Sequence, residues 1–201
     1  MSATRILLLR HGQSEWNAQG RWQGQADPPL SELGLRQAHA AAAALGAVDA
    51  IASSDLDRAL TTALLLSEQL GVGPVVVEPD LRERNAGEWS GLTRDEIEIA
   101  YPGFLAERRR PPSWEDDEPL LARVLAAIGR IAELAPGGEI LAVTHGGVVY
   151  TMESHLGLDH GGYLANVGGR WIDVDGDRIT PGERITLVDG DDAMVTVPRV
   201  L

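Results

Sequence analysis

Short apolar runs alternate with amphipathic stretches along most of this chain, and that alternation constrains the fold more than any other feature. The runs have the length of strands, and the stretches between them carry leucine, isoleucine and alanine at helical spacing. Serine or aspartate begins several of these stretches and glycine follows them, as helix caps do. Strands that alternate with helices are typical of a mainly parallel sheet covered on both faces, so we predict an α/β three-layer sandwich. The predicted strands are 6–9, 48–53, 74–78 and 139–144, and the predicted helices are 31–45, 55 or 57–70, 117–134 and 148–156.

Two parts of the chain depart from this alternation. Asp175 and Gly176 separate the strand-like segments 171–174 and 178–180, which predicts a hairpin with a type I′ turn. Residues 85–118 contain prolines, an arginine run and many acids, without a sustained period. We predict that they form a small, partly helical insertion over one end of the sheet. Residues 1–201 are then one domain that carries this insertion.

The composition excludes several kinds of chemistry. Cysteine is absent, which removes disulfides, thiolate nucleophiles and cysteine-ligated metals. All 17 basic residues are arginine, so a Schiff-base lysine and the lysine of a phosphate-binding P-loop are also absent. The formal net charge of −13 argues against nucleic acid as a partner. A few arginines that converge in one pocket still bind a small phosphate, because net charge does not decide such a site.

The chain offers no segment suited to a membrane. No apolar run approaches the roughly 18 residues that a membrane span needs. The first strand begins within a few residues of Met1, without the apolar region and small-residue cleavage site of a secretory signal. We therefore expect a cytoplasmic location and no membrane partner.

Histidine, arginine and glutamate follow directly after the predicted strands. The first strand ends in Arg-His-Gly, the strand 139–144 is followed by His-Gly-Gly, and the valine strand leads to Leu-Arg-Glu. Ligands bind at the carboxyl ends of the strands in open parallel sheets, so we expect these side chains to meet at one edge. Glycine after each histidine lets backbone N–H groups approach a ligand. The side chains concerned are Arg10, His11, Arg58, Glu83 and His145.

These residue types suit phosphoryl transfer through a covalent phosphohistidine. A neutral imidazole is a nucleophile near neutral pH, and arginine forks match phosphate oxygens. A helix that begins at Gly146 adds backbone N–H groups and a favourable dipole. A carboxyl group must then protonate the leaving alkoxide and later activate water. We favour Glu83 for this role because it lies nearer to a strand end than Glu88, the competing candidate.

Four sequence blocks together resemble the histidine phosphatase superfamily, also called phosphoglycerate-mutase-like, and its phosphatase branch in particular. They are LLLRHGQSEWNAQGRWQGQADPPLSELG, IASSDLDRALTTA, LRERNAGEWSGLT and LAVTHGG, in the family's order and spacing over about residues 5–147. The resemblance implies that His11 is the phosphorylated nucleophile and Glu83 the proton donor, without cofactor or metal. It also implies that His145 bonds the phosphoryl oxygens as a charged donor. The remaining phosphate or substrate positions implied are Arg10, Asn17, Gln23, Gly24 and Arg58.

The leading prediction is a phosphomonoesterase that hydrolyses a small phosphorylated metabolite, and a cofactor-dependent phosphoglycerate mutase is the alternative. The mutases are longer and carry a tyrosine where this chain has Ala86, and the short insertion should leave the phosphoenzyme open to water. Many phosphatases of the family have a Gly-Gly-Glu-Ser-like stretch before the long helix. This chain has Ser-Trp-Glu-Asp-Asp at 113–117 instead, so a relative's specificity does not transfer directly.

Other interpretations of the same residues stay open. The fold could serve as a non-catalytic phosphate-binding or interaction module, although all five core positions are present. The histidines could be core residues or zinc ligands, but the predicted neighbours are arginines, which repel a cation. The arginine run is either a solvated charge cluster or includes one contact to the distal part of the substrate. Trp22, Trp89 and Trp114 could line the mouth of the pocket, but we favour aromatic packing as their role. The arginine run consists of Arg108, Arg109 and Arg110.

Overall fold

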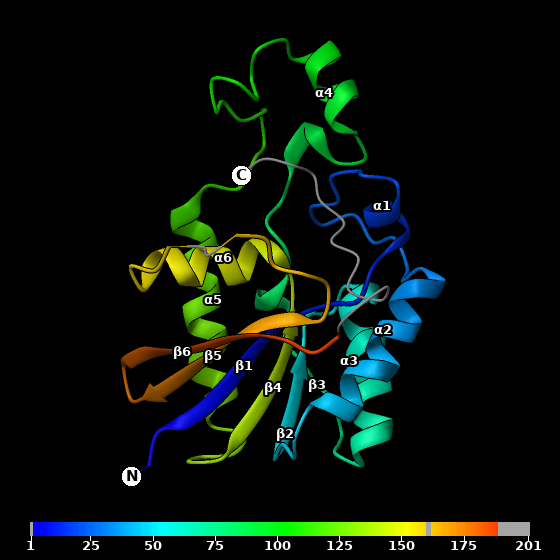
Figure 1. The fold of residues 1–201 in the computed structure, drawn as a ribbon. Helices are drawn as coiled ribbons and strands as arrows, with labels where there is room; N and C mark the ends of the chain where they lie inside the picture. Colours follow the sequence, from blue (N-terminus) through cyan, green and yellow to red (C-terminus); the bar gives the residue numbers. More distant parts are fainter. Residues whose placement is uncertain (1, 160–161, 189–201) are drawn as a thin grey trace.

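A six-stranded sheet forms the centre of the computed structural model, which describes residues 2–159 and 162–188 (Figure 1). Its strand order is β3-β2-β4-β1-β5-β6. The pairs among β1, β2, β3 and β4 are parallel, whereas β5 and β6 are antiparallel additions at one edge. The predicted mainly parallel sheet is confirmed. The strands are β1 Thr4–Arg10, β2 Ala50–Ser53, β3 Val76–Val77, β4 Glu139–Thr144, β5 Gly168–Asp175 and β6 Arg178–Thr186.

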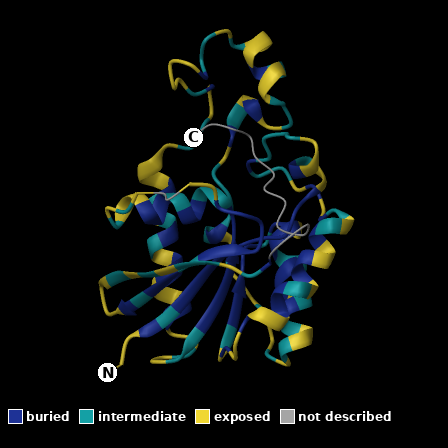
Figure 2. Ribbon diagram, in the orientation of Figure 1, coloured by how far each residue is buried: buried dark blue, intermediate teal, exposed yellow. Residues whose placement is uncertain are grey.

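Helices cover both faces of the sheet, which completes the predicted three layers. The strand β1 reads as a continuous apolar run because its side chains alternate between two buried faces. Ile6 and Leu8 pack with α5 and α6, and Leu7 and Leu9 pack with α2 and α3. The central strands are accordingly the most buried part of the ribbon (Figure 2). The helices are α2 Glu32–Ala44, α3 Asp57–Leu70, α5 Asp117–Ala132 and α6 Gly146–His155.

The helix ends follow from local capping. Ser31 accepts a hydrogen bond from the backbone N–H of Gly34 and so begins α2, as predicted. The helix α3 ends at Gly71, which adopts a left-handed φ of 66°. The helix α6 begins at Gly146, as expected for the phosphate site and two residues before the start that apolar spacing predicted.

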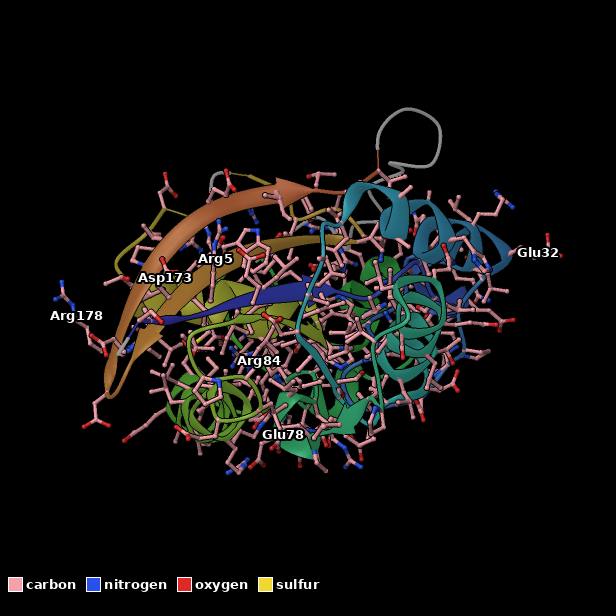
Figure 3. The ribbon with its side chains drawn as sticks, turned by 90° about the horizontal axis from the view of Figure 1, so that it is seen from below. Arg5, Glu32, Glu78, Arg84, Asp173 and Arg178 are labelled. Carbon is pink, nitrogen blue, oxygen red and sulfur yellow. The ribbon has the colours of Figure 1, made fainter. Side chains whose placement is uncertain are left out.

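Two strand predictions need correction. The strand predicted over 74–78 shrinks to Val76–Val77, because only these two residues pair with β2 before the chain turns into a 3-10 helix at Pro79. The hairpin exists, but Asp175 pairs with Arg178, so the two turn residues are Gly176 and Asp177. A positive φ occurs at Gly176 (58°) and not at Asp177, whereas a type I′ turn needs both. Arg178 lies at the tip of this hairpin (Figure 3).

The segment between β3 and α5 lies beyond the carboxyl ends of the strands (Figure 1). It packs around a small apolar cluster that it shares with the loop before α2, in which Trp22, Trp89 and Trp114 meet edge to face with ring centroids 5.5 to 5.7 Å apart. The aromatic packing predicted for these three residues is confirmed. Among the residues described, no helix has the length and apolar character that crossing a bilayer requires. The short helices of this end are α1 Glu15–Ala18, η1 Pro79–Leu81, η2 Gly87–Trp89 and α4 Arg94–Ala100.

Candidate active site

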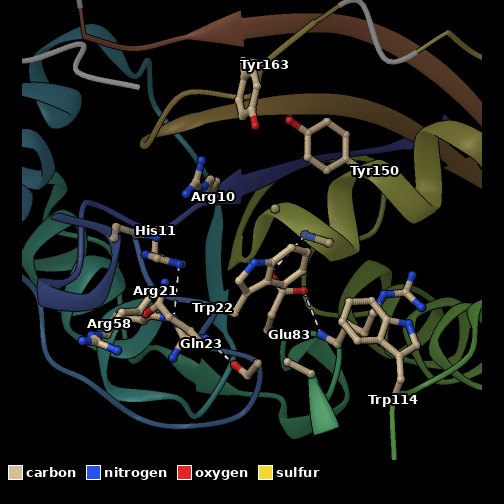
Figure 4. A pocket seen from close by; sticks show the side chains of 16 residues that line it. Arg10, His11, Arg21, Trp22, Gln23, Arg58, Glu83, Trp114, Tyr150 and Tyr163 are labelled. Atoms are coloured by element: carbon tan, nitrogen blue, oxygen red, sulfur yellow. Dashed lines mark hydrogen bonds between the residues drawn. The ribbon is translucent and has the colours of Figure 1, made fainter. Parts of the chain in front are cut away.

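A pocket at the carboxyl ends of the strands brings together nearly all of the predicted site residues (Figure 4). Arg10 ends β1, Arg58 lies in the first turn of α3, and Glu83 follows η1. His145 does not line the pocket itself; its ring lies behind that of His11, with the centroids 5.2 Å apart. The predicted residues that line the pocket are Arg10, His11, Asn17, Gln23, Gly24, Arg58, Glu83 and Gly146.

The hydrogen bonds of His11 define which ring nitrogen is free to react. Its Nδ1 lies 2.6 Å from the carbonyl oxygen of Gly12, which only accepts, so Nδ1 carries the hydrogen. The Nε2 atom therefore has the lone pair, and the Nε–H of Arg58 donates to it at 3.2 Å. Burial, together with the charges of Arg58 and Arg10, lowers the pKa of His11 well below its ordinary value. The ring is thus neutral, and Nε2 carries the lone pair that a nucleophile requires.

Two buried arginines give this pocket its positive charge. Arg10 donates to the carbonyl oxygen of Leu164 at 2.7 Å, and Arg58 donates to those of Gly24 (2.8 Å) and Ala26 (2.7 Å). Burial lowers the pKa of Arg58 to about 10, which still leaves it charged at neutral pH. Its ion pair with Asp27 is long, at 4.0 Å. Backbone carbonyls therefore orient these cations, and their charge stays available to an anion.

His145 differs from the expectation of a charged donor. Burial lowers its pKa well below the ordinary value, and the neighbouring Arg58 and His11 add to this effect. Its Nε2 lies 2.9 Å from the hydroxyl oxygen of Ser54, and its Nδ1 is buried without a partner among the described residues. A further positive charge beside Arg10 and Arg58 is unfavourable, so His145 is neutral here.

We expect these two histidines to make the folded state sensitive to mild acid. Between the ordinary pKa of about 6.5 and their lowered native values, the unfolded chain binds protons that the native state does not. The free energy of unfolding should therefore fall below pH 6.5, by about 1.4 kcal/mol per pH unit for each histidine. Denaturant unfolding at pH 7.5 and pH 5.5 measures this.

The double variant His11→Asn, His145→Asn is the control for this pH dependence. Its free energy of unfolding should change much less between the two pH values, because both titrating rings are gone. An equal change in the free energy of unfolding between the two pH values for both proteins would contradict the assignment of neutral, buried histidines.

The carboxylate of Glu83 is held by two backbone N–H groups and points into the pocket (Figure 4). Arg84 N donates to Oε1 at 2.7 Å, and Gly147 N donates to Oε2 at 3.1 Å. A Cβ atom at Gly147 would lie 2.1 Å from Oε1, so the carboxylate requires glycine at this position. Glu88 is exposed, accepts a hydrogen bond from the Tyr101 hydroxyl and does not line the pocket. The geometry therefore favours Glu83 over Glu88.

The loop before α2 supplies the amide groups of the pocket. Asn17 Oδ1 accepts from Ser14 N at 3.2 Å, and Gln23 Oε1 accepts from the Ser14 hydroxyl at 2.7 Å. Gly24 has a φ of 53°, and a Cβ atom there would lie 2.6 Å from Ala86 N. Side chains of the loop are thus held by one serine cap, and the loop approaches Ala86 closely because Gly24 has no side chain.

Several pocket residues did not follow from the sequence. Tyr150 lies one helical turn after Gly146, so helical spacing could have identified it, and its hydroxyl accepts from Leu164 N at 2.8 Å. The others come from loops, which carry no periodic signal. The guanidinium carbon of Arg110 lies 4.9 Å from the ring centroid of Trp114, and Arg110 lines a neighbouring pocket. Arg108 and Arg109 line neither pocket. The residues added by the structure are Arg21, Arg84, Tyr150 and Tyr163, whereas Trp22 and Trp114 line the pocket as the less favoured alternative for these tryptophans had it.

No metal site is built into the described part of the chain. Within 2–159 and 162–188, no three histidine, aspartate or glutamate side chains are grouped so as to hold a metal ion. The pocket presents His11 together with the cationic Arg10 and Arg58, and this set of groups suits an anion.

The chain matches the family model of the histidine phosphatase superfamily (branch 1) over residues 6–175. It is 40% identical over 156 residues to a metal-independent phosphoserine phosphatase of Arabidopsis thaliana, covering 73% of this chain and 66%, just under two thirds, of that protein. It is 38% identical over 173 residues to a glucosyl-3-phosphoglycerate phosphatase of Mycobacterium tuberculosis, covering 78% of this chain and 76% of that protein. The chain therefore belongs to the histidine phosphatase superfamily.

Solved structures agree with this assignment. A mycobacterial glucosyl-3-phosphoglycerate phosphatase in complex with VO3 has a TM-score of 0.78 and 33% identity, covering 88% of this chain and 96% of its own. A phosphoserine phosphatase variant from Entamoeba histolytica in complex with phosphoserine has a TM-score of 0.75 and 26% identity, covering 92% and 98% of the two chains. The fold described above is thus the fold of these phosphatases.

Proposed function

We propose that this protein is a phosphomonoesterase that hydrolyses a small phosphorylated metabolite through a phosphohistidine on His11. The observation that carries the proposal is the hydrogen-bonded state of His11. Gly12 O holds the hydrogen on Nδ1, which leaves Nε2 with its lone pair beside the guanidinium of Arg58. A neutral nucleophile next to buried cations is suited to attack on a phosphate dianion.

In the first step, Nε2 of His11 attacks phosphorus and the bond from phosphorus to the ester oxygen breaks. Arg10 and Arg58 stay charged while negative charge shifts between the phosphoryl oxygens. The backbone N–H groups at the start of α6 also point toward this end of the sheet. Glu83, in its acid form, gives its proton to the departing alkoxide, which leaves as an alcohol.

In the second step, the carboxylate of Glu83 takes a proton from water. The water oxygen attacks phosphorus, the bond between phosphorus and Nε2 breaks, and inorganic phosphate leaves. The carboxyl group regains its proton, and His11 its neutral ring. One carboxyl group thus serves as acid and then as base, for which a position facing the nucleophile across the pocket is suitable.

Hydrolysis fits this site better than the mutase reaction. The position at which the mutases carry a tyrosine is Ala86 in this chain, a buried residue that packs against Gly24. A phosphoglycerate mutase would be recognised by 2-phosphoglycerate forming from 3-phosphoglycerate and 2,3-bisphosphoglycerate faster than phosphate is released. That result would reverse the assignment.

We propose a small phosphomonoester as the substrate, and neither nucleic acid nor a membrane as a partner. The relatives are named for phosphoserine and glucosyl-3-phosphoglycerate, both of which carry a carboxylate. Arg21 and Arg84 add two cations to the wall of the pocket, which supports testing such esters first. One domain over residues 1–201 and a cytoplasmic location stay predictions.

Activity should survive removal of metal ions. The substrate panel contains phosphoserine, 3-phosphoglycerate, glucosyl-3-phosphoglycerate, glycerol 3-phosphate and p-nitrophenyl phosphate, and each is assayed for phosphate release with and without EDTA. We expect release from at least one alkyl ester, unchanged within about twofold by EDTA, because the arginines replace a metal as the counter-charge. Loss of activity on chelation, restored by a divalent cation, would indicate a metal-dependent hydrolase instead.

A further inference from the structure

Arg123, on α5, uses every N–H of its guanidinium in a single set of contacts. Its Nε donates to Glu115 Oε1 at 2.8 Å and its Nη2 to Glu115 Oε2 at 2.9 Å. Its Nη1 donates to the carbonyl oxygens of Asp80 and Arg82, both at 2.7 Å, and its Nη2 also donates to that of Glu83 at 3.0 Å. The side chain is 17% exposed and that of Glu115 is 15% exposed. A planar fork with five donors is therefore fully satisfied.

The three carbonyl groups all belong to the segment that ends in Glu83. This segment has no place in the sheet, because β3 ends at Val77 and η1 is a single 3-10 turn. Its position relative to α5 and α6 therefore depends on the buried side chain of Leu81 and on side chains that reach its backbone from outside, such as Thr144, whose Oγ1 donates to the Leu81 carbonyl oxygen at 2.8 Å. Arg123 reaches it from α5, and Gln25 Nε2 also donates to the Glu83 carbonyl at 3.1 Å. Arg123 itself does not line the pocket.

We propose that Arg123 is the positioning residue of the proton donor: from α5 it fixes the backbone of residues 80–83 and thereby aims the Glu83 carboxyl group at the pocket. The inference rests on the proposed function, in which Glu83 protonates the leaving group. Proton transfer needs the acid within hydrogen-bond reach of the ester oxygen, and small displacements reduce it strongly.

Glu115 keeps the charge of Arg123 compensated. Burial raises the pKa of Glu115, but the hydrogen bonds from Arg123 and from the backbone N–H of Asn85 lower it by more. The pKa is therefore lowered overall, and the carboxylate stays ionised. The Glu115 carbonyl oxygen also accepts from Arg84 at 2.6 Å. Glu115 lies in the 113–117 stretch that departs from the pattern of many related phosphatases. In this chain, therefore, that stretch supports the acid.

The test compares two classes of ester in Arg123→Lys, which keeps the positive charge but has three donors and no planar fork. An alkyl phosphate needs a proton on its leaving group, whereas p-nitrophenolate leaves as an anion. We expect kcat/KM for the best alkyl phosphate of the panel to fall about 10- to 100-fold, part of the value of a general acid. For p-nitrophenyl phosphate it should fall less than about threefold. Glu115→Gln should show the same selectivity with a smaller loss.

Arg130→Ala is the matched control. Arg130 lies two turns further along α5 and pairs with Glu78 and Asp80 beside the same segment, but it is half exposed and donates to none of the three carbonyls. We expect Arg130→Ala to change kcat/KM for both substrates by no more than about twofold. Equal losses of kcat/KM on both esters in Arg123→Lys and Glu115→Gln would show a general structural role and overturn the inference. Unchanged kcat/KM in both variants would overturn it as well.

Failure of the inference is distinguishable from failure of the proposed function. If the unmodified protein releases phosphate from no ester of the panel, the proposed function is wrong. If it hydrolyses both ester classes but Glu83→Gln lowers kcat/KM equally for both, Glu83 is not the proton donor and the role of Arg123 falls with it. Selective loss in both Glu83→Gln and Arg123→Lys supports the inference.

Discussion

His11→Ala is expected to lower phosphate release by at least about 10⁴-fold on every ester of the panel. The substitution removes the atom that forms the covalent bond, and knocking out a nucleophile costs other enzymes up to about 10⁶-fold in kcat. Arg10 and Arg58 remain in the pocket, so binding of substrate should survive. Incubation with ³²P-labelled substrate, quenched with alkaline detergent, should label the unmodified protein, and the label should be stable to base and labile to acid. The variant should carry none.

His39→Ala is the control for this experiment. His39 is an exposed residue of α2 that contacts Gln69, and neither residue lines the pocket. It should retain full activity and full labelling. If His11→Ala kept more than about 1% of the activity, or became labelled to the same extent, the phosphohistidine mechanism would be wrong for this chain.

Glu83→Gln is expected to separate esters by their leaving groups. Glutamine keeps nearly the same shape and can accept the hydrogen bonds from Arg84 N or Gly147 N with its one carbonyl oxygen, but it holds no transferable proton. Hydrolysis of alkyl phosphates should fall about 10²- to 10⁴-fold, the usual value of general acid–base catalysis. Formation of the phosphoenzyme from p-nitrophenyl phosphate should be far less affected, and a burst of p-nitrophenolate should precede slow turnover.

The burst distinguishes the two roles of this carboxyl group. Its first role is dispensable for a good leaving group, whereas its second role, in activating water, is required for every substrate. Stopped-flow absorbance resolves the two phases. Glu88→Gln, at the exposed competitor, should behave like the unmodified protein. A large loss in Glu88→Gln together with a small one in Glu83→Gln would transfer the assignment to Glu88.

The periodic helices of the fold were predictable from the sequence, whereas the length of β3 and the position of the hairpin turn were not. The helices α2, α3 and α5 follow from apolar spacing and from caps such as Ser31 and Gly71. The strand β3 was overestimated because three valines in a row indicate a strand, whereas strand length depends on pairing with β2. The hairpin turn was placed one residue too early for the same kind of reason, since register is set between the strands.

Several predicted site residues, such as Arg10, Arg58 and Gly146, lie at strand ends or in helix first turns, where sequence position implies spatial position. His145 was predicted to bind the phosphoryl oxygens as a charged donor, whereas its ring lies beside that of His11 without lining the pocket and burial lowers its pKa. The residues that were missed come from loops, from α6 (Tyr150) and from α5 (Arg123). Arg123 illustrates this: in the sequence it is one arginine on an amphipathic helix, and its five contacts exist only in the folded chain.

The sequence by itself determined the α/β architecture, the family and the groups able to carry out the chemistry. These follow from local patterns, because strand and helix periods and the residues next to a strand end are properties of neighbouring positions. The tertiary structure decided which nitrogen of His11 is free, that His145 is neutral, that Glu83 and not Glu88 faces the pocket, and what holds Glu83 there. These depend on burial, on backbone carbonyls and on cations brought from distant segments, and no local pattern records them.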